Sequence, residues 1–547
     1  MAMTRRTAAC WRHEVLAERR LTDVKRHRPS GPLLGRGFVR AIAASLLALA
    51  CHTRVGAGEQ ARAKQARSLD APLDRDADSA SSPSATARTV EVADVVSIEG
   101  DRLYLLSEPR GLVAFDISNI EQPREIWHDT IDGIPAALFV HKGTALAAVT
   151  DWGGPGSSPV HGSLLRAIDV QSANAALVRS EVALRGEIRD IHAVDGVYYV
   201  LREDASKAPR YLTVLTSFRV DDGGTIRRLD ELPMLGASSS FAVSPTKIAV
   251  ARRSIGPAGT DLTFVDIDRV PAGPLSERGS LHLPGTLRVG PEPRLDPGGR
   301  FLWVVTCGAS DCGPRSTLAL SSIDSVDMAA PREAGKLILP PTRGSLVAVF
   351  NGARLFLAES DGTLETRGSI LYVVDLAQPD RPTLQRGSIR ISGAVSNMIP
   401  IGDRLLAIAS GGTSGTSTHV LVHTVELAPL GELRLLESAE FGEDWTSVAP
   451  ASVPRNVVDD AGGQWLGLPF STWDEDRRRY ATGIEILRRA PHGFTSAGAV
   501  PANEWVGRVL FLRGRFIGVS ASGLTVVDPL QVGGWVAGVP TDERNWR

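Results

Sequence analysis

The chain has 547 residues, a net charge of −2 and an aromatic content of 5%. Because both signs of charge are interspersed along the chain, the sequence shows no basic surface and predicts no nucleic-acid partner. The 54 glycines and 34 prolines are typical of an all-β chain with frequent turns.

Residues 1–51 carry the features of an export signal. Arg40 precedes an uncharged apolar stretch, 41–50, which is too short to span a bilayer but suits a secretory signal. Cys51 follows at once and resembles the lipidated cysteine of bacterial lipoproteins. We therefore expect export with lipidation at Cys51; soluble secretion and an uncleaved anchor are the alternatives. The basic residues 1–32 are longer than an ordinary signal requires, which an over-extended translation start would explain.

The next segment, residues 52–87, is predicted to be a disordered linker. It lacks aromatic residues and is rich in Ala, Arg, Asp and Ser, so it cannot bury enough apolar surface to fold.

After the linker, a short apolar run repeatedly stops at a turn pair and resumes, at intervals of about 42 to 60 residues apart from one doubled gap. Glycine, or an Asx residue that tolerates positive φ, allows two antiparallel strands to reverse tightly at such pairs. A ninth, degenerate copy at Pro245-Thr246 occupies the doubled gap. The other pairs are Gly100-Asp101, Lys142-Gly143, Asp195-Gly196, Gly298-Gly299, Asn351-Gly352, Gly402-Asp403, Gly462-Gly463 and Arg513-Gly514.

Repeats of this length that contain only strands predict a β-propeller, in which each repeat is one four-stranded blade. The first repeat shows the pattern, with strands expected at 95–98, 103–106, 111–115 and 124–127. Their apolar runs are nearly continuous, which indicates strands that are covered on both faces, as in stacked blades.

The repeats form one predicted domain, residues 88–535, followed by a tail at 536–547. Because the units are of uneven quality and rings of nine are rare, we expect about eight blades, within a range of seven to nine. We also expect residues 89–92 to close the ring by pairing with the final blade.

An aspartate recurs at the end of the third strand of the repeats. Such a carboxylate can accept hydrogen bonds from backbone N–H groups two residues later, and a turn that every blade needs explains it better than calcium binding or catalysis. These residues are Asp116, Asp169, Asp266, Asp375 and Asp528.

Two cysteines, Cys307 and Cys312, flank a short loop after an apolar strand. They are expected to form a disulfide in an oxidising compartment. Two free thiols and half of a metal site are the alternatives, but no ligand cluster lies nearby in the sequence, and we predict neither a metal nor a cofactor.

Two further motifs carry weak chemical signals. Ser244 to Lys247 matches the S-x-x-K pattern of penicillin-recognising enzymes, but Pro245 places it in a hairpin and no K-T-G follows. His419 and His423 share a strand face about 13 Å apart, which is too far for one metal without a third partner. We interpret these two histidines as solvated or capping residues.

The chain resembles secreted bacterial proteins with a C-terminal β-propeller domain distantly related to WD40 repeats. The resemblance covers roughly residues 90 to 530. It rests on the phrase 113–118 followed by Pro123, and on a closing block, 464–469, 483–487 and 506–511, in that family's order. It implies a propeller fold and export, and no settled enzymatic activity.

The sequence therefore favours an exported, lipid-anchored, non-catalytic propeller that acts as a binding or scaffolding module in the bacterial envelope. We expect a monomer whose partner is a protein or an envelope polymer, located on the outer membrane or in the periplasmic or extracellular space. Long insertions would serve as recognition elements. They are Asp151 to Gly162, Asp204 to Arg210, Ser410 to Thr418 and the connection from Leu427 to Pro454.

The alternative is an envelope hydrolase or other enzyme with a carboxylate site at the mouth of the propeller channel. Its candidate acids are Asp459, Asp460, Asp474 and Glu475.

Overall fold

The computed structural model of the chain describes most of the residues from Arg88 to Gly538, which belong to one compact unit. The described ranges are 88–108, 110–153, 162–172, 175–204, 211–268, 275–287, 293–296, 298–308, 316–341, 344–360, 368–385, 387–411, 419–428, 432–442, 447–448, 465–474, 479–502, 504, 506–521, 523–531 and 537–538.

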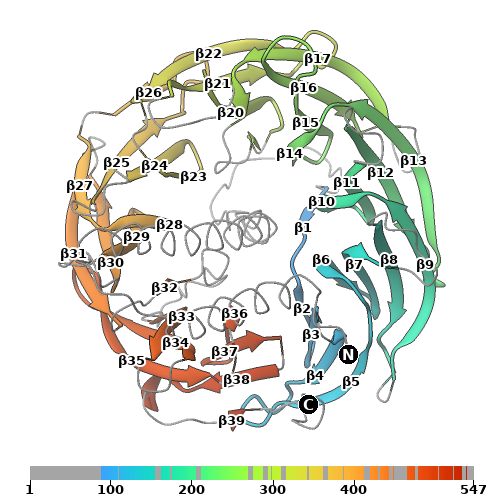
Figure 1. Ribbon diagram of the computed structural model, residues 1–547, viewed down its shortest axis with the longest axis vertical. Helices are drawn as coiled ribbons and strands as arrows, with labels where there is room; N and C mark the ends of the chain where they lie inside the picture. The colour runs from blue at the N-terminus through green and yellow to red at the C-terminus, as the bar shows by residue number, and fades with distance from the viewer. Residues whose placement is uncertain are drawn as a thin grey trace, which may run out of the picture. The chain divides into compact units, whose positions relative to one another are not determined.

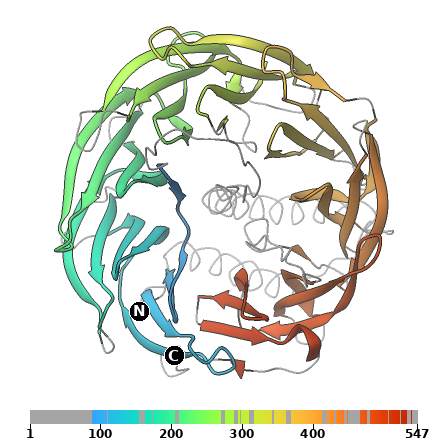
Figure 2. The ribbon, with the colours of Figure 1, turned by 180° about the vertical axis from the view of Figure 1, so that it is seen from behind.

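These residues form nine antiparallel sheets that follow one another around a ring in chain order (Figures 1 and 2). We number the sheets blade 1 to blade 9. In each blade the first strand lies toward the inside of the ring and the fourth toward the outside. Nine blades stand at the upper end of the predicted range and exceed the expected eight by one, because the degenerate Pro245-Thr246 unit forms a complete blade.

Blade 1 contains β2 (Val96–Glu99), β3 (Arg102–Ser107), β4 (Gly111–Asp116) and β5 (Arg124–Asp129). Blade 2 contains β6 (Ile134–His141), β7 (Thr144–Trp152), β8 (Gly162–Asp169) and β9 (Leu177–Arg185). Blade 3 contains β10 (Glu187–Val194), β11 (Val197–Asp204), β12 (Leu212–Val220) and β13 (Ile226–Leu235). Blade 4 contains β14 (Ser238–Val243), β15 (Lys247–Arg253), β16 (Gly259–Asp266) and β17 (Ser276–Pro284). Blade 5 contains β18 (Thr286–Leu287), β19 (Arg294–Leu295), β20 (Phe301–Cys307), β21 (Leu318–Asp324) and β22 (Arg332–Leu339). Blade 6 contains β23 (Leu346–Asn351), β24 (Arg354–Ser360), β25 (Gly368–Asp375), β26 (Thr383–Leu384) and β27 (Ile389–Ser392). Blade 7 contains β28 (Ala394–Ile401), β29 (Arg404–Gly411), β30 (His419–Leu427) and β31 (Leu433–Phe441). Blade 8 contains β32 (Ser447–Val448), β33 (Trp465–Asp474), β34 (Arg479–Arg489) and β35 (Phe494–Ala502). Blade 9 contains β36 (Val506–Leu512), β37 (Arg515–Ser520), β38 (Gly523–Val527) and β39 (Ala537–Gly538).

The predicted turn pairs join the first strand of a blade to the second. Lys142-Gly143 and Asp195-Gly196 have positive φ at both residues, 49° and 74° in the first pair and 49° and 72° in the second. This is the geometry of a type I′ hairpin, whose twist matches that of the flanking strands. Eight of the nine predicted pairs are described and lie in hairpins, whereas Gly462-Gly463 lies outside the described residues.

The hydrophobic core lies between the blades. In the part of the chain that the structure describes, it consists of nine clusters of buried side chains, and each cluster joins the facing sides of two neighbouring blades, including blades 9 and 1. The eight residues of β11 are all buried, as expected for a strand covered on both faces. The prediction drawn from the continuous apolar runs is therefore confirmed.

The predicted closure of the ring was wrong. The segment expected to pair with blade 9 forms β1 (Val90–Val92), which adds a fifth strand to blade 3 by pairing antiparallel with β10 on the inside of the ring (Figure 1). Blade 9 has no need of that strand, because β36 to β39 supply its four strands.

The described part of the chain holds no helix with the length and apolar character that crossing a membrane requires.

Candidate functional site

The antiparallel order of the strands gives the ring two different faces. The hairpins between first and second strands open on one face together with the turns between third and fourth strands; we call this the turn face. The loops between second and third strands open on the opposite face together with the connectors between blades; we call this the loop face.

Three of the four predicted recognition segments belong to the loop face. Residues 151–162, 204–210 and 410–418 each join the second strand of a blade to the third, in blades 2, 3 and 7. Most of their residues lie outside the described ranges, but the strands that hold their ends are described. The fourth segment, 427–454, is not one connection, because it contains β31 and β32.

Among the described residues, exposed large apolar side chains on the loop face include Tyr211 and Ile255, as well as Leu235, which ends β13 and is 55% exposed. Tyr211, directly before β12, is 42% exposed, and Ile255, in the short loop between β15 and β16, is 56% exposed. They belong to the neighbouring blades 3 and 4, so this part of the loop face offers apolar surface to a partner.

A repeated hydrogen bond fixes the frame that carries these loops. A side-chain hydroxyl near the start of the third strand donates a hydrogen bond to a backbone carbonyl of the connector that leads into the next blade. This bond ties the base of the loop between the second and third strands to both blades. The bonds run from Ser163 to Gly186 (2.8 Å), Thr213 to Gly236 (2.6 Å), Thr260 to Gly285 (2.9 Å), Ser369 to Gly393 (2.9 Å) and Thr482 to Glu504 (2.7 Å).

Sequence reasoning missed these residues, although a signal exists. In the first four pairs the hydroxyl residue precedes the connector glycine by 23 to 25 positions. A regular Ser/Thr-to-Gly spacing inside each repeat would have identified them.

His419 takes the place of the hydroxyl residue in blade 7. Its Nδ1 lies 3.0 Å from the carbonyl oxygen of Gly442, in the connector to blade 8, so the predicted capping role is confirmed for this residue. His423 is 1% exposed and lies between Ser438 and the carbonyl of Ser392, at 2.7 Å and 2.8 Å. It is therefore not solvated, and burial lowers its pKa despite the bond to Ser392.

The third-strand aspartates act as turn caps on the turn face. In six blades the Oδ1 atom accepts a hydrogen bond from the backbone N–H two residues later, which confirms the prediction and adds Asp324 to it. The bonds are Ser118 to Asp116 (2.9 Å), Gln171 to Asp169 (3.0 Å), Asp268 to Asp266 (3.0 Å), Val326 to Asp324 (3.2 Å), Ala377 to Asp375 (2.9 Å) and Leu530 to Asp528 (2.9 Å).

In five of these blades the other carboxylate oxygen pairs with an arginine of the same blade. The pairs are Asp116 with Arg124, Asp169 with Arg179, Asp266 with Arg278, Asp324 with Arg332 and Asp528 with Arg515. Hydrogen bonds from the side chain and backbone of Ser118, together with Arg124, lower the pKa of Asp116 to about 2. A carboxylate with two such partners fixes the turn between third and fourth strands.

A second contact on the turn face joins neighbouring blades. A basic side chain donates to the backbone carbonyl of the residue that directly follows the capping aspartate in the next blade; we call this contact a staple. The staples are Arg102 to Val170, Lys247 to Ser325 and Arg513 to Ile117. Arg88, which precedes β1 and pairs with Asp195 of blade 3, makes the same contact with Ile267 of blade 4.

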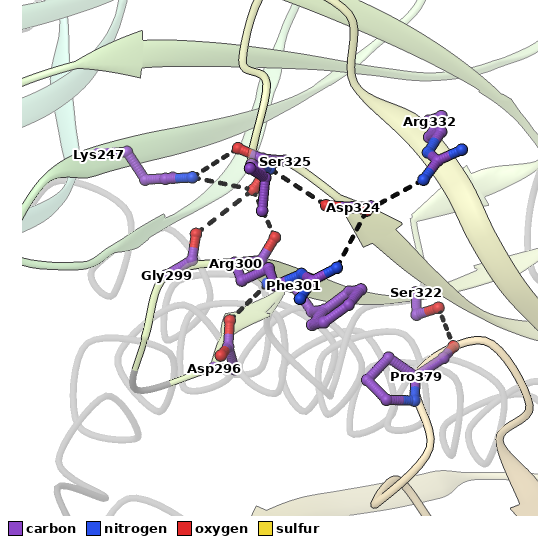
Figure 3. Close-up of polar contacts among 11 residues, drawn as sticks. Lys247, Asp296, Gly299, Arg300, Phe301, Ser322, Asp324, Ser325, Arg332 and Pro379 are labelled. Carbon is purple, nitrogen blue, oxygen red and sulfur yellow. Dashed lines mark hydrogen bonds and ion pairs between the residues drawn. The ribbon is translucent and has the colours of Figure 1, made fainter.

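Figure 3 shows the staple between blades 4 and 5. The Nζ atom of Lys247 donates to the carbonyl of Ser325 at 2.6 Å and lies 3.3 Å from the Oγ of the same residue. The Ser325 hydroxyl donates in turn to the carbonyl of Arg300 at 2.9 Å. Burial lowers the pKa of Lys247, while Asp296, Asp324 and Asp266 oppose that shift.

This geometry explains the S-x-x-K motif. The Oγ of Ser244 and the backbone of Lys247 bond to each other across the hairpin, at 3.2 Å in both directions. The two polar side chains of the motif, Ser244 and Lys247, are only 3% and 6% exposed, which leaves a substrate no open approach to the serine. The motif therefore stabilises a hairpin and a blade junction.

The residues proposed from the sequence as chemical sites are mostly untested by the structure. Cys51, Cys312, Asp459, Asp460 and Glu475 lie outside the described residues. Asp474 ends β33, so its backbone lies at the loop-face end of blade 8. The enzyme alternative gains no support and no opposition from these positions.

Cys307 ends β20 and is disulfide-bonded. Its predicted partner, Cys312, is not among the described residues, so the pairing stays a prediction. Within the described ranges, no group of three or more His, Cys, Asp or Glu side chains is placed to hold a metal ion.

Together these features define a nine-bladed β-propeller whose loop face and turn face are held by different repeated contacts. No protein-family model matches the chain. No curated protein matches it.

Among solved structures, the chain is similar to Sqt1 from Chaetomium thermophilum bound to the N-terminus of the ribosomal protein L10, with 13% identity over 71% of this chain and 92% of that one and a TM-score of 0.41. It is also similar to the β-propeller domain of the Trilobed protease from Pyrococcus furiosus, with 10% identity over 64% and 93% of the two chains and a TM-score of 0.31. A third similarity is to an acylaminoacyl peptidase from Pyrococcus horikoshii, with 11% identity over 61% and 49% and a TM-score of 0.29. Similarities at this level assign no function.

Proposed function

We propose that this protein is an exported, lipid-anchored, non-catalytic propeller that binds a protein or an envelope polymer through its loop face and so acts as a scaffold in the bacterial envelope. The export signal and Cys51 support the location, and the linker at 52–87 would hold the ring away from a membrane. The loop face supports the binding role.

The observation that carries the proposal is the shared placement of the insertions. Loops in blades 2, 3 and 7 begin and end on the same face, and that face also carries the exposed side chains of Tyr211 and Ile255. The third-strand hydrogen bonds hold the bases of the loops in blades 2, 3 and 7 through Ser163, Thr213 and His419. Variable loops on a rigid frame are the usual construction of a binding surface.

A pull-down from envelope extract tests the binding role. The full-length protein should retain a specific partner, and the pair Tyr211→Ser and Ile255→Ser should weaken retention about tenfold or more. Val326→Ser and Leu530→Ser provide the matched control, because these side chains are 65% and 79% exposed on the turn face. Equal loss in both pairs, or retention unchanged by the loop-face pair, would contradict the proposal.

Mass spectrometry of the mature protein tests the anchor. The wild-type amino terminus should carry a lipid on Cys51 and fractionate with membranes, whereas Cys51→Ala should be unlipidated. An unmodified amino terminus in both proteins would remove the anchor from the proposal but leave the binding role intact.

A further inference from the structure

The segment Arg88–Val95, which we call the strap, runs along the inner strands of several blades before the chain enters blade 1. Its residues Val90 to Val92 pair with β10 of blade 3. The carbonyl of Asp94 accepts a hydrogen bond from Leu138 of blade 2, and the carbonyl of Val95 accepts one from Leu106 of blade 1. Figure 1 shows β1 inside the ring beside β10.

The two ends of the strap make the strongest side-chain contacts. At one end, the Nε of Arg88 lies 2.6 Å from Asp195 of blade 3, and its Nη1 donates to the carbonyl of Ile267 in blade 4 at 3.1 Å. At the other end, Arg508 of blade 9 donates from Nε and Nη2 to the Oδ1 of Asp94, at 3.2 Å and 3.0 Å. The side chains of Asp94 and Arg508 are only 2% and 8% exposed.

The contact with Arg508 lies at the seam between blades 9 and 1. Every other pair of neighbouring blades is joined by a connector of the chain, but blades 9 and 1 are the last and the first and have none. The seam also lacks an exchanged strand, since each of its blades is built from its own segment of chain. Among the described residues, the contacts across the seam are non-covalent, and they include a cluster that joins Leu105 and Phe115 to Ile517 and Leu524.

We propose that the strap is a clasp that holds the ring closed at this seam. It links blade 9 to blades 1, 2, 3 and 4, so release of the strap frees blades 9 and 1 to separate and exposes their apolar faces. The strap begins at Arg88, so a pull on the amino terminus would first break the contacts of Arg88 and β1 with blades 3 and 4 and would then reach Asp94 at the seam. The seam thus has a closed state, in which the strap is bound, and an open state, in which the strap is released.

If the strap is a clasp, a substitution that detaches it at blade 3 should loosen the distant seam between blades 9 and 1. Val90 packs against the cluster between blades 3 and 4, so Val90→Asp should detach the strap at blade 3. Hydrogen exchange of the full-length protein should then rise about tenfold or more not only in β10 but also in β36 and β3 at the seam. Exposed Glu91 points away from that cluster, so Glu91→Lys is the matched control and should leave exchange at the seam unchanged.

A rise confined to β10 would overturn the clasp and leave β1 as a local addition to blade 3. Asp94→Asn provides a second test should Val90→Asp fail to fold, because it keeps the shape of the side chain and removes its charge. It should speed exchange at the seam by a similar factor without changing the distant blades 5 and 6. Unchanged exchange in β36 and β3 for this variant would also overturn the proposal.

Discussion

Asp116 combines two contacts in one carboxylate. One oxygen accepts the N–H of Ser118, and the other pairs with Arg124, whose side chain is 79% exposed. The turn contact with the backbone should therefore matter more to stability than the ion pair with the exposed Arg124 side chain, since exposed pairs contribute little.

Substitution at Asp116 separates these two contributions. Asp116→Asn keeps an oxygen for Ser118 and should reduce the free energy of unfolding by less than about 1 kcal/mol. Asp116→Ala removes both contacts and should cost about 1–2 kcal/mol. Urea denaturation at pH 7 measures both values, and equal losses would show that the ion pair is the dominant contact.

Asp116 also makes the stability of the folded state depend on pH. The pKa of Asp116 falls from 3.8 to about 2 on folding, so the charged form stabilises the folded state. This stabilisation is fully present above pH 3.8 and is lost as the pH falls toward 2. The difference in stability between wild type and Asp116→Ala should therefore shrink across that interval.

Glu485 shows the opposite behaviour. It is 3% exposed, and burial raises its pKa above 4.5 although Ser496 donates a hydrogen bond to it. Below pH 4.5 the carboxyl is protonated in both states; as the pH rises from there through the folded-state pKa, the unfolded state loses its proton first and stability falls.

Glu485→Gln should remove that loss. The melting temperature of the variant should exceed that of wild type at pH 7, while the two should nearly coincide at pH 4. Thermal melts at the two pH values measure the difference. An identical shift at both would show that the charge of Glu485 plays no part.

At the scale of elements, the connectors between blades depend on glycine. Gly186 has a φ of +83°, and a Cβ there would lie 2.3 Å from the carbonyl oxygen of Glu203 in the next blade. Gly196, in the hairpin of the same blade, has a φ of +72° with open space around it. The first glycine is required by both conformation and packing, the second by conformation alone.

Alanine substitution distinguishes the two requirements. Gly196→Ala should cost roughly 1–2 kcal/mol from the left-handed backbone alone. Gly186→Ala should cost about 1–3 kcal/mol more, because the backbone of β11 must shift. Equal losses in chemical denaturation would show that the connector relaxes without strain.

The elements also show what the sequence could predict. Hairpins such as Asp195-Gly196 and caps such as Asp116 depend on residues close in sequence, so the pattern of one repeat was enough to identify them. The pairing of β1 with β10 joins Val90 to Val194, and a strand of three residues carries no local signal for so distant a partner. The staple of Lys247 was missed for the same reason, since its acceptor lies 78 residues away.

At the scale of the whole molecule, the fold is a ring of similar junctions with one exception. Nine hydrophobic clusters join the blades, yet only the junction between blades 9 and 1 lacks a connecting segment of chain. Staples of the same kind lie at this seam, from Arg513, and at the ordinary junction between blades 1 and 2, from Arg102. The two arginines thus make the same contact in different topological settings.

Replacement of each arginine by methionine shows what the connector contributes. Global unfolding breaks both junctions, so Arg513→Met and Arg102→Met should each reduce the free energy of unfolding by about 1–2 kcal/mol. Partial opening differs, because the chain still holds blades 1 and 2 together after their staple is lost, whereas nothing covalent holds blades 9 and 1. Hydrogen exchange should therefore accelerate in β36 and β3 for Arg513→Met and stay near the wild-type rate at the junction of blades 1 and 2 for Arg102→Met. Faster exchange at both junctions would mean that the connectors add nothing and that the blades separate with equal ease all around the ring.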